Sequence, residues 1–365
     1  MLAEILVENI QNILPLLAKI LPAHSQIPIL SHILIDAKNE GLFITATNLE
    51  FGAQIKIPAK IIENGKAALP GKYFIELISS FPKEKFTIQK DKEKVDLVTR
   101  DSKFTLQTLP AEEFPKLFDN VTGEKIHVGK ELLEKAFSKV LLSISQEETR
   151  PELTGVCLVR KEEKEEIVTT DGYRLSLFKS GTGIGMKEDG VVILSSKLIQ
   201  EIVSLKKEGN LFIDLTTNQA LFETGEIVLV GRMIAGRYPQ YEKILPKSFK
   251  TKITVEKNQF YQETRLAAVL ARENANILKL VIKDEKIILS ARSSGVGEGQ
   301  GQIDVVQEGE DTDISFNARY LLDFLKQCEG EEIVMELNSS LEPAKFFDNT
   351  NPNYFHIIMP VRVQD

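Results

Sequence analysis

The sequence predicts an α+β protein of three tandem, structurally similar domains, each with two helices packed on β-sheets. Its 365 residues are too many for one ordinary hydrophobic core. The same order of strands and helices recurs about every 120 to 125 residues. Hydrophobic residues make up 42% of the chain and charged residues 27%, a balance typical of folded globular domains.

Composition also limits the class of protein. No apolar run approaches the roughly 20 residues that span a bilayer, and the amino terminus lacks the basic and apolar regions of a signal peptide. Cys157 and Cys328 lie far apart in the chain and fit a reducing compartment, so we expect a cytoplasmic protein. The net charge of −8 argues against binding DNA by overall charge, but it does not exclude basic residues gathered on one surface.

Each third begins with a short strand and an amphipathic helix. The strands are expected at residues 5–7, 126–128 and 253–255. Pro15 is tolerable only near the first turn of its helix, because proline has no backbone N–H. Helical spacing predicts a buried face in each of the first two helices, formed by Ile13, Leu14, Leu17, Ile20 and Leu21, and by Leu133, Ala136, Phe137, Val140 and Leu141.

The corresponding helix of the last third has two apolar faces. They consist of Phe260, Thr264, Ala267 and Ala271, and of Leu266, Val269 and Leu270. One face fits the domain's own sheet. The other fits either a neighbouring subunit or a deeper position in the core.

A strand pair around a polar turn follows in each third. The pairs are expected within residues 29–48, 153–172 and 276–295. The acidic run KEEKEE that starts at Lys161 is expected to be a solvated hairpin tip.

Each third then has a second helix with a basic residue near its start. These helices lie within residues 69–81, 194–205 and 316–328, and their basic residues are Lys72, Lys197 and Arg319. Ser195, Ser196 and Asn317 are plausible N-caps. The predicted apolar faces are Phe74, Leu77, Ile78 and Phe81; Leu198, Ile202 and Leu205; and Leu321, Phe324, Leu325 and Cys328. Strands follow at 86–89, 211–215 and 333–337, which predicts domains at residues 1–123, 124–247 and 248–365.

Three such units in tandem can form an arc, and two arcs related by a two-fold axis can close into a ring without exposed sheet edges. Open solenoids are an alternative. If helices line the bore, basic residues on them would contact phosphates non-specifically. The candidates are Lys72 and Lys197, with Lys19, Lys135, Lys139, Arg265 and Arg272; for each, a solvated surface position is the simpler interpretation.

Several segments resemble the bacterial DNA polymerase sliding clamp family, the β clamps. RPELTGVCLVRKEEKEEIVTTDGYRLS, from Arg150 to Ser176, resembles the family's middle domain, and GRYPQYEKILP, from Gly236, resembles its linker into the third domain. FNARYLLDFL from Phe316 and YFHIIMPVRV from Tyr354 resemble the third domain. PILSHILI and KFTLQTLPAEEFP, which begin at residues 28 and 103, resemble the first domain. The resemblance therefore spans the whole chain in the family's order.

The resemblance implies a processivity factor of the replicative DNA polymerase III, with no catalytic activity and no cofactor or metal. It implies a head-to-tail homodimer, which forms a ring of six similar domains around duplex DNA. A clamp loader that uses ATP would open and place this ring. The polymerase α subunit, the loader, other polymerases and mismatch-repair proteins would bind through short linear motifs in a pocket between the second and third domains.

The resemblance also assigns residues to this expected pocket. They are Leu153, Thr170, Gly172, Tyr173, Arg174 and Leu175 from the middle domain, Pro239, Lys243 and Ile244 from the linker, and Asn317, Tyr320, Leu341, Ile357, Met359, Pro360, Val361 and Arg362 from the third domain. Apolar and methionine side chains suit an adaptable peptide groove. Tyr173 replaces a frequent histidine and Lys243 a frequent arginine, while Ala275 and the tail residues Gln364 and Asp365 also depart from the family pattern.

The dimer contact implied by the resemblance joins a strand with Lys103, Phe104 and Leu106 to Val269, Leu270 and the region of Glu298 on the partner. His24 and Arg150 match positions near DNA, beside the candidates Lys72 and Lys197.

Other chemistries find little support. His24, His32, His127 and His356 form no metal-ligand spacing, and we expect His127 and His356 to be packing residues. The glycines at 181, 183 and 185, and the segment from Gly295, are expected to be loops rather than phosphate sites. Two alternatives remain: an open-arc adaptor that binds peptides without enclosing DNA, and a hydrolase that uses Asp171 with Glu50 or Glu76. The oligomeric state distinguishes the first, and an activity screen the second.

Overall fold

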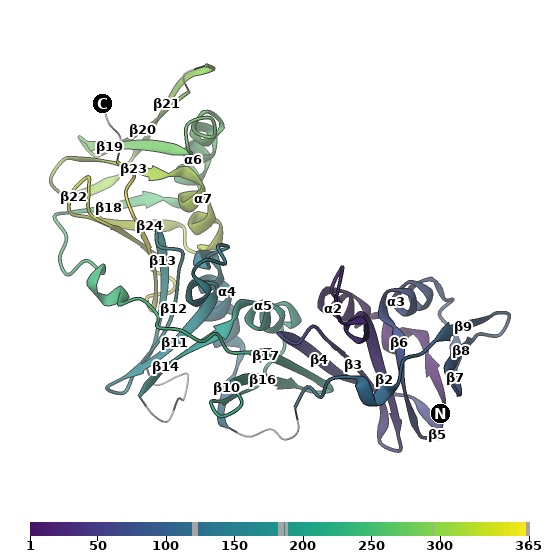
Figure 1. Ribbon diagram of the computed structural model, residues 1–365. Helices are drawn as coiled ribbons and strands as arrows, with labels where there is room; N and C mark the ends of the chain where they lie inside the picture. The colour runs from purple at the N-terminus through teal and green to yellow at the C-terminus, as the bar shows by residue number, and fades with distance from the viewer. Residues whose placement is uncertain (119–122, 182–185, 187–188, 294, 363–365) are drawn as a thin grey trace. The chain divides into compact units, whose positions relative to one another are not determined.

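The computed structural model describes residues 1–118, 123–181, 186, 189–293 and 295–362, and its contacts divide the chain into two compact units. The first unit contains Met1–Gly129 and Ser204–Met233, and the second contains Lys130–Val203 and Ile234–Asp365. Part of the middle third therefore lies in each unit (Figure 1). The predicted boundaries at Gly123 and Lys247 remain predictions.

The first unit has two antiparallel sheets. In order across the five-stranded sheet are β5 (Lys60–Glu63), β1 (Leu2–Leu6), β7 (Lys85–Asp91), β8 (Lys94–Val98) and β9 (Lys103–Gln107). In order across the eight-stranded sheet are β10 (Glu124–Val128), β15 (Gly209–Asp214), β16 (Gln219–Thr224), β17 (Ile227–Arg232), β4 (Phe51–Ile57), β3 (Gly41–Thr47), β2 (His32–Lys38) and β6 (Gly65–Pro70). Since β17 pairs with β4, strands of the first and middle thirds share one sheet.

The first predicted helix of this unit is broken in two. The structure has α1 (Val7–Gln11) and α2 (Leu14–Ile20), with Pro15 in the first turn of α2. Because Pro15 cannot donate a backbone hydrogen bond, one continuous helix would lose the bond to residue 11. Helix α3 (Gly71–Ser80) buries Phe74 and Ile78 as predicted and packs against α1 and α2. Short 3-10 helices complete the unit at Pro28–Ser31 and Ala111–Glu113.

The second unit also has two antiparallel sheets. In order across the nine-stranded sheet are β14 (Gly190–Ser195), β11 (Gly155–Lys161), β12 (Lys164–Thr170), β13 (Arg174–Gly181), β26 (Tyr354–Ile358), β25 (Ala344–Asp348), β24 (Glu332–Leu337), β18 (Thr251–Glu256) and β22 (Val306–Gly309). In order across the four-stranded sheet are β21 (Gly297–Asp304), β20 (Lys286–Ser293), β19 (Ile277–Lys283) and β23 (Thr312–Asn317).

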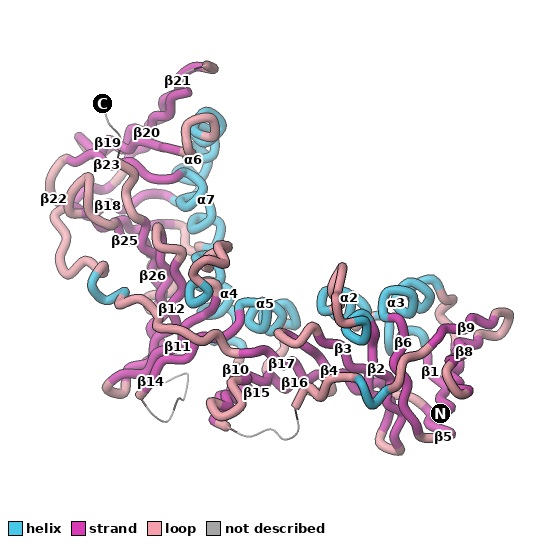
Figure 2. Tube along the Cα trace, in the orientation of Figure 1, coloured by secondary structure: helices cyan, strands magenta, loops and turns pink. Residues whose placement is uncertain are grey.

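Helices of the second unit pack on these sheets (Figure 2). Helix α6 (Lys257–Ala271) contacts β19, β20 and β21, and α7 (Ala318–Gln327) contacts α6, β23 and β26. The predicted helix of the middle third is irregular, with a π-helical turn at Leu132–Phe137, α4 at Ser138–Val140 and a 3-10 turn at Leu141–Ser143. Helix α5 spans Ser196–Leu205, and further 3-10 turns lie at Pro151–Leu153 and Tyr241–Lys243.

The three predicted hairpins are confirmed. The last residue pairs before the three turns are Lys38 with Gly41, Lys161 with Lys164, and Lys283 with Lys286. Glu162 and Glu163 form the solvated tip expected of the acidic run and adopt positive φ. The same run also contains a buried residue, since the side chain of Glu165 points inward and accepts a hydrogen bond from the backbone N–H of Met186.

Candidate peptide-binding surface

The pairing of β13 with β26 brings residues of the middle and last thirds together. Leu175 lies opposite Ile357, and the N–H of Met359 donates to the carbonyl of Tyr173 at 2.8 Å. The N–H of Val361 donates to the carbonyl of Ser315 in β23, also at 2.8 Å. The end of the described chain is therefore attached to both sheets of the second unit.

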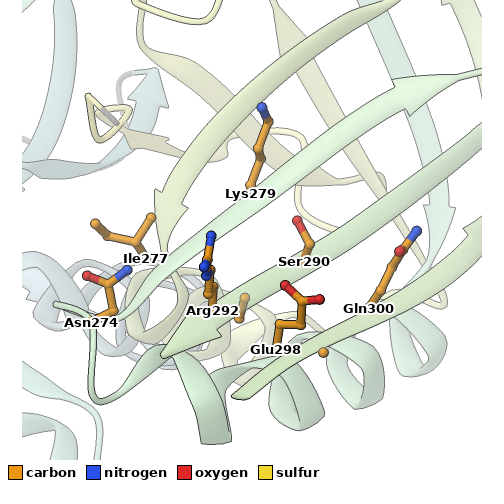
Figure 3. Close-up of a pocket in the computed structure, with 9 residues that line it drawn as sticks. Asn274, Ile277, Lys279, Ser290, Arg292, Glu298 and Gln300 are labelled. Atoms are coloured by element: carbon orange, nitrogen blue, oxygen red, sulfur yellow. The ribbon is translucent and has the colours of Figure 1, made fainter. Parts of the chain in front are cut away.

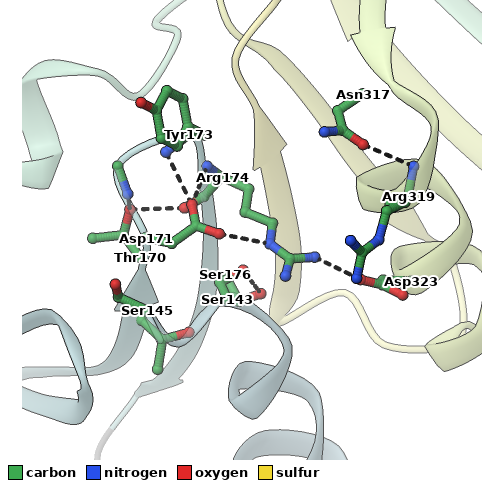
Figure 4. Close-up of polar contacts among 12 residues, drawn as sticks. Ser143, Ser145, Thr170, Asp171, Tyr173, Arg174, Ser176, Asn317, Arg319 and Asp323 are labelled. Atoms are coloured by element: carbon green, nitrogen blue, oxygen red, sulfur yellow. Dashed lines mark hydrogen bonds and ion pairs between the residues drawn. The ribbon is translucent and has the colours of Figure 1, made fainter. Parts of the chain in front are cut away.

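A tight turn connects β12 to β13 (Figure 4). The hydroxyl of Thr170 donates to the carbonyl of Arg174 at 2.7 Å and accepts the N–H of Gly172 at 3.1 Å. One carboxylate oxygen of Asp171 accepts the N–H groups of both Tyr173 and Arg174 at 2.9 Å. Gly172 has a φ of +92°, a conformation that glycine adopts without steric cost. The turn leaves the ring of Tyr173 64% exposed.

Arg174 is held by three neighbours. Its Nε donates to Asp171 Oδ2 at 3.0 Å and its Nη1 donates to Asp323 Oδ2 at 2.9 Å (Figure 4). Its guanidinium carbon lies 4.4 Å from the centre of the Tyr320 ring. Burial, with a smaller contribution from the charge of Asp171, raises the pKa of Tyr320. Because both carboxylates and the ring contact one largely buried guanidinium, its orientation is fixed.

Asp323 is absent from the residues that the sequence assigned to the pocket. It lies three residues after Tyr320 on α7, and such residues share one helix face. Helical spacing from Tyr320 could therefore have identified it.

The apolar floor of this surface is one buried cluster. Leu153, Leu175 and Ile357 belong to it, together with Tyr238 and Tyr241 of the linker. The hydroxyl of Tyr241, which sequence reasoning also missed, donates to Glu166 Oε2 at 2.5 Å. Both tyrosines fix the linker that carries Pro239, Lys243 and Ile244.

The remaining predicted pocket residues are more exposed. Pro239, Asn317, Tyr320, Met359, Pro360 and Val361 are half-buried, whereas Lys243, Ile244, Leu341 and Arg362 are exposed. Asn317 caps α7 as predicted, by accepting the N–H of Arg319 at 2.9 Å. We call the predicted pocket residues, with Asp323, the candidate peptide surface. It combines a fixed apolar floor, exposed apolar side chains and one oriented cation, which suits an extended peptide.

A buried polar network supports the floor. Ser176 Oγ lies 2.8 Å from Ser143 Oγ and 2.9 Å from His356 Nδ1, and the imidazole stacks on Phe324 with ring centres 5.4 Å apart. Burial, with a smaller contribution from the positive Arg174, lowers the pKa of His356 to about 3. The predicted packing role of His356 is confirmed. That of His127 is wrong, because this side chain is exposed on β10, on the face opposite the buried Ile126 and Val128.

The residues predicted for the dimer contact lie at two sheet edges. Strand β9 is an edge strand, and on it Phe104 is 40% exposed with its ring 5.7 Å from that of Phe81. Lys103 is exposed and pairs with Asp96 at 2.8 Å, and this contact lowers the pKa of Asp96. Leu106 is half-buried.

The second edge is β21. It carries the exposed Glu298, which lies opposite Arg292 on β20 and lines a cavity of about 470 Å³ (Figure 3). On the adjacent helix α6, Val269 is 61% exposed and Leu270 is half-buried. The other face of α6 buries Phe260, Thr264 and Ala271 as predicted, whereas the predicted Ala267 is half-buried and Ala268 is buried instead.

The residues predicted to face DNA are exposed, with one exception. His24, Lys72, Arg150 and Lys197 are all exposed, and Arg150 lies 3.7 Å from Glu152. Lys72 and Lys197 are each the second residue of their helices, α3 and α5. Lys139 contradicts its prediction. Its side chain is buried, donates to the carbonyl of Gln327 and pairs with Glu329 at 2.8 Å.

Other predictions concern metal sites, loops and membrane spans. Within the described ranges, no group of three or more histidine, cysteine or acidic side chains is placed to hold a metal ion. The loop glycines at 183 and 185, and the tail residues Gln364 and Asp365, lie outside these ranges. A search of the described residues finds no helix long and apolar enough to span a membrane.

Comparison with known proteins identifies the family. Residues 3–118, 127–240 and 242–362 match the families described as DNA polymerase III beta subunit, N-terminal, central and C-terminal domain. The beta sliding clamp of Staphylococcus aureus (strain Mu50) is 28% identical over 357 residues, which cover 94% of each chain.

Solved structures agree with this assignment. The DNA polymerase sliding clamp from Bacillus subtilis is 26% identical, with 100% of both chains covered and a TM-score of 0.93. The DNA polymerase III subunit beta from Pseudomonas aeruginosa has the same fold, with a TM-score of 0.93 at 23% identity and 100% coverage of both chains. The chain therefore belongs to the DNA polymerase III beta subunit family, the bacterial sliding clamps, which are non-catalytic processivity factors.

Proposed function

We propose that two copies of this sliding clamp assemble head to tail into a cytoplasmic ring around duplex DNA. The candidate peptide surface then holds the polymerase α subunit, the clamp loader, other polymerases and mismatch-repair proteins on the ring. The observation that carries the proposal is the pair of exposed sheet edges, β9 and β21, each of which lies beside apolar side chains.

The two edges are complementary in chemistry. Among the described strands, β9 pairs with β8 alone, and it carries Phe104 and Leu106. Strand β21 pairs with β20 alone and lies next to α6, where a Cβ at Gly299 would lie 2.9 Å from Leu270 Cδ1. Strand addition between copies would pair both edges and bury these side chains with Val269. A head-to-tail dimer repeats this contact twice and closes.

The candidate peptide surface provides the tether. Its floor is fixed by the core cluster and by the orientation of Arg174, so little ordering cost falls on the clamp when a peptide binds. Exposed Tyr173, Ile244 and Leu341 can cover the apolar side chains of a partner's linear motif.

Contact with DNA would be weak and non-specific. The exposed Lys72 and Lys197 occupy equivalent helix positions, and His24 and Arg150 are exposed as well. Contacts of this kind go to phosphates and weaken with salt. Retention would therefore come from enclosure rather than affinity.

Loading onto circular DNA tests the proposal. The clamp is placed on a nicked circular plasmid by a bacterial clamp loader with ATP, and free protein is removed by gel filtration at high salt. We expect the clamp to stay with the circle and to leave after one restriction cut. Equal retention on circular and linear DNA would contradict enclosure.

A further inference from the structure

The turn before β4 in the first unit repeats the turn of the candidate peptide surface. The hydroxyl of Thr47 donates to the carbonyl of Phe51 at 3.2 Å and accepts the N–H of Leu49 at 3.0 Å. Asn48 Oδ1 accepts the N–H groups of Glu50 and Phe51 at 3.1 and 2.8 Å. These are the bonds that Thr170 and Asp171 make in the second unit. Leu49 therefore corresponds to Gly172.

The strand that pairs with this turn is also equivalent. Phe51 of β4 lies opposite Gly231 of β17, as Arg174 of β13 lies opposite Ile358 of β26. The N–H of Arg232 donates to the carbonyl of Glu50 at 2.9 Å, which reproduces the bond from Met359 to Tyr173. Figure 1 shows β4 and β17 as neighbours in the first unit. Arg232 therefore corresponds to Met359.

A cavity of about 60 Å³ lies at this turn. Its lining combines apolar and polar side chains: Leu49, Phe51, Pro115, Leu117 and Val230, with Thr47, Glu50, Lys116, Gln219 and Arg232. Gly52 makes room for part of this wall, because a Cβ there would lie 2.4 Å from Leu117 Cδ2. Since one water needs about 10–15 Å³ of such space, the cavity can accept the end of one aliphatic side chain.

Leu49 is unusual at its position. Its φ is +74°, a conformation rare for bulky residues, and its side chain is 42% exposed. The equivalent position in the second unit is a glycine, which adopts this conformation without cost. A half-exposed leucine contributes little burial to offset the strain, so its apolar side chain is available for a ligand.

Three charged side chains line the cavity: the cations Lys116 and Arg232, and the carboxylate of Glu50. The side chain of Arg232 is exposed. At the equivalent turn of the second unit the cation is Arg174, which is already paired with Asp171 and Asp323. With two cations and one carboxylate, the lining has a net positive charge beside its apolar residues, which favours a carboxylate next to an aliphatic side chain.

We propose that this cavity is a second docking site, for an extended peptide of a partner protein with an aliphatic side chain followed by an acidic one. This inference rests on the proposed function, because it extends peptide binding from the turn of the second unit to the equivalent turn of the first unit. It selects a different peptide, since Phe51 and Arg232 replace Arg174 and Met359. One clamp would thus hold two kinds of partner segment.

Methyl NMR tests the site on the full-length clamp with labelled leucine and valine methyl groups. The probe is the capped peptide Ser-Ala-Leu-Asp-Ser, titrated to millimolar concentration. We expect shifts at the methyls of Leu49, Leu117 and Val230, and about tenfold weaker binding for Arg232→Gln or for the probe with asparagine in place of aspartate. Lys83→Gln, at an exposed lysine, is the matched charge control and should bind normally.

Leu49→Gly separates binding from folding. It restores the glycine found at position 172 and should fold at least as well as the parent chain, yet it should lose the titration. Unmoved Leu49, Leu117 and Val230 methyls in the parent clamp, or a titration midpoint that Arg232→Gln leaves unchanged, would overturn the second site. Failure of the proposed function is distinguishable, because it would appear as loss of retention on circular DNA while this titration is unchanged.

Discussion

At the scale of single residues, Arg174 connects two parts of the second unit. One charged partner, Asp171, lies in the turn before β13. The other, Asp323, lies on α7, 149 positions along the chain from Arg174. The stacking of its guanidinium on Tyr320 adds a third constraint. The shape of the candidate peptide surface therefore depends on a carboxylate, Asp323, that is not assigned to the surface by resemblance.

Asp323→Asn tests this dependence. The substitution removes one charged partner of Arg174 while keeping the side-chain size, so Asp171 and the Tyr320 ring alone hold the guanidinium and its orientation is less constrained. We expect a labelled clamp-binding peptide of the polymerase to bind about five- to tenfold more weakly, as measured by fluorescence anisotropy. Asp313→Asn, which removes the exposed ion pair with Lys279, is the control and should bind normally. Normal binding by Asp323→Asn would show that the pair does not position Arg174.

His356 makes the stability of the second unit depend on pH. Its folded pKa of about 3 lies below the ordinary value of 6.5, so between these values the unfolded chain binds a proton that the native protein does not. Stability attributable to this histidine is therefore present above pH 6.5 and is lost as pH falls toward 3. His356→Phe should reduce the slope of unfolding free energy against pH by up to about 1.4 kcal/mol per pH unit in this window.

Urea unfolding between pH 5 and 7 measures that slope. His127→Gln is the matched control, since it removes an exposed imidazole from β10. An equal slope in His356→Phe and the parent protein would contradict a buried neutral imidazole.

At the scale of elements, local patterns predicted most of the fold. The three hairpins and the faces of α3, α6 and α7 follow from spacing of two and of 3.6 residues, which is a local property. The cap by Asn317 is local as well. The candidate surface depended on the family resemblance, because spacing alone does not reveal that β13 pairs with β26.

Two of the differences between predicted and observed burial arise from contacts between residues far apart in the chain. Lys139 was predicted to be an exposed basic residue on an amphipathic helix. Instead, Glu329 and the carbonyl of Gln327 bind its ammonium group. Glu165 belongs to an acidic run but faces inward beneath Met186. His127 alternates with the buried Ile126 and Val128, so its side chain lies on the solvent face of β10. The partners of Lys139 and Glu165 lie far along the chain and cannot be predicted from neighbouring residues.

The exposed face of α6 allows a test of the proposed dimer contact. Val269→Asp places a charge among the apolar side chains of the proposed contact between β9 of one copy and β21 with α6 of the other, the seam. We therefore expect the dimer dissociation constant to rise at least about tenfold. Analytical ultracentrifugation measures it. Leu215→Asp, at an exposed leucine of the first unit that is outside the seam, should leave dimerisation unchanged. Equal weakening by both substitutions would argue against a seam at α6.

At the scale of the whole molecule, the proposed ring depends on the edges β9 and β21. A chain that keeps both edges uncovered would be an adaptor that binds peptides without enclosing DNA, which is the main alternative. In the proposed ring, pairing between copies would cover both edges and would make retention on DNA independent of affinity.

The solution mass, measured by light scattering after gel filtration at several protein concentrations, tests the ring most directly. The proposed ring predicts a particle with twice the 41.0 kDa mass of one chain at micromolar concentration and above. A particle with the mass of a single chain at those concentrations would contradict a preformed ring and would favour the open adaptor.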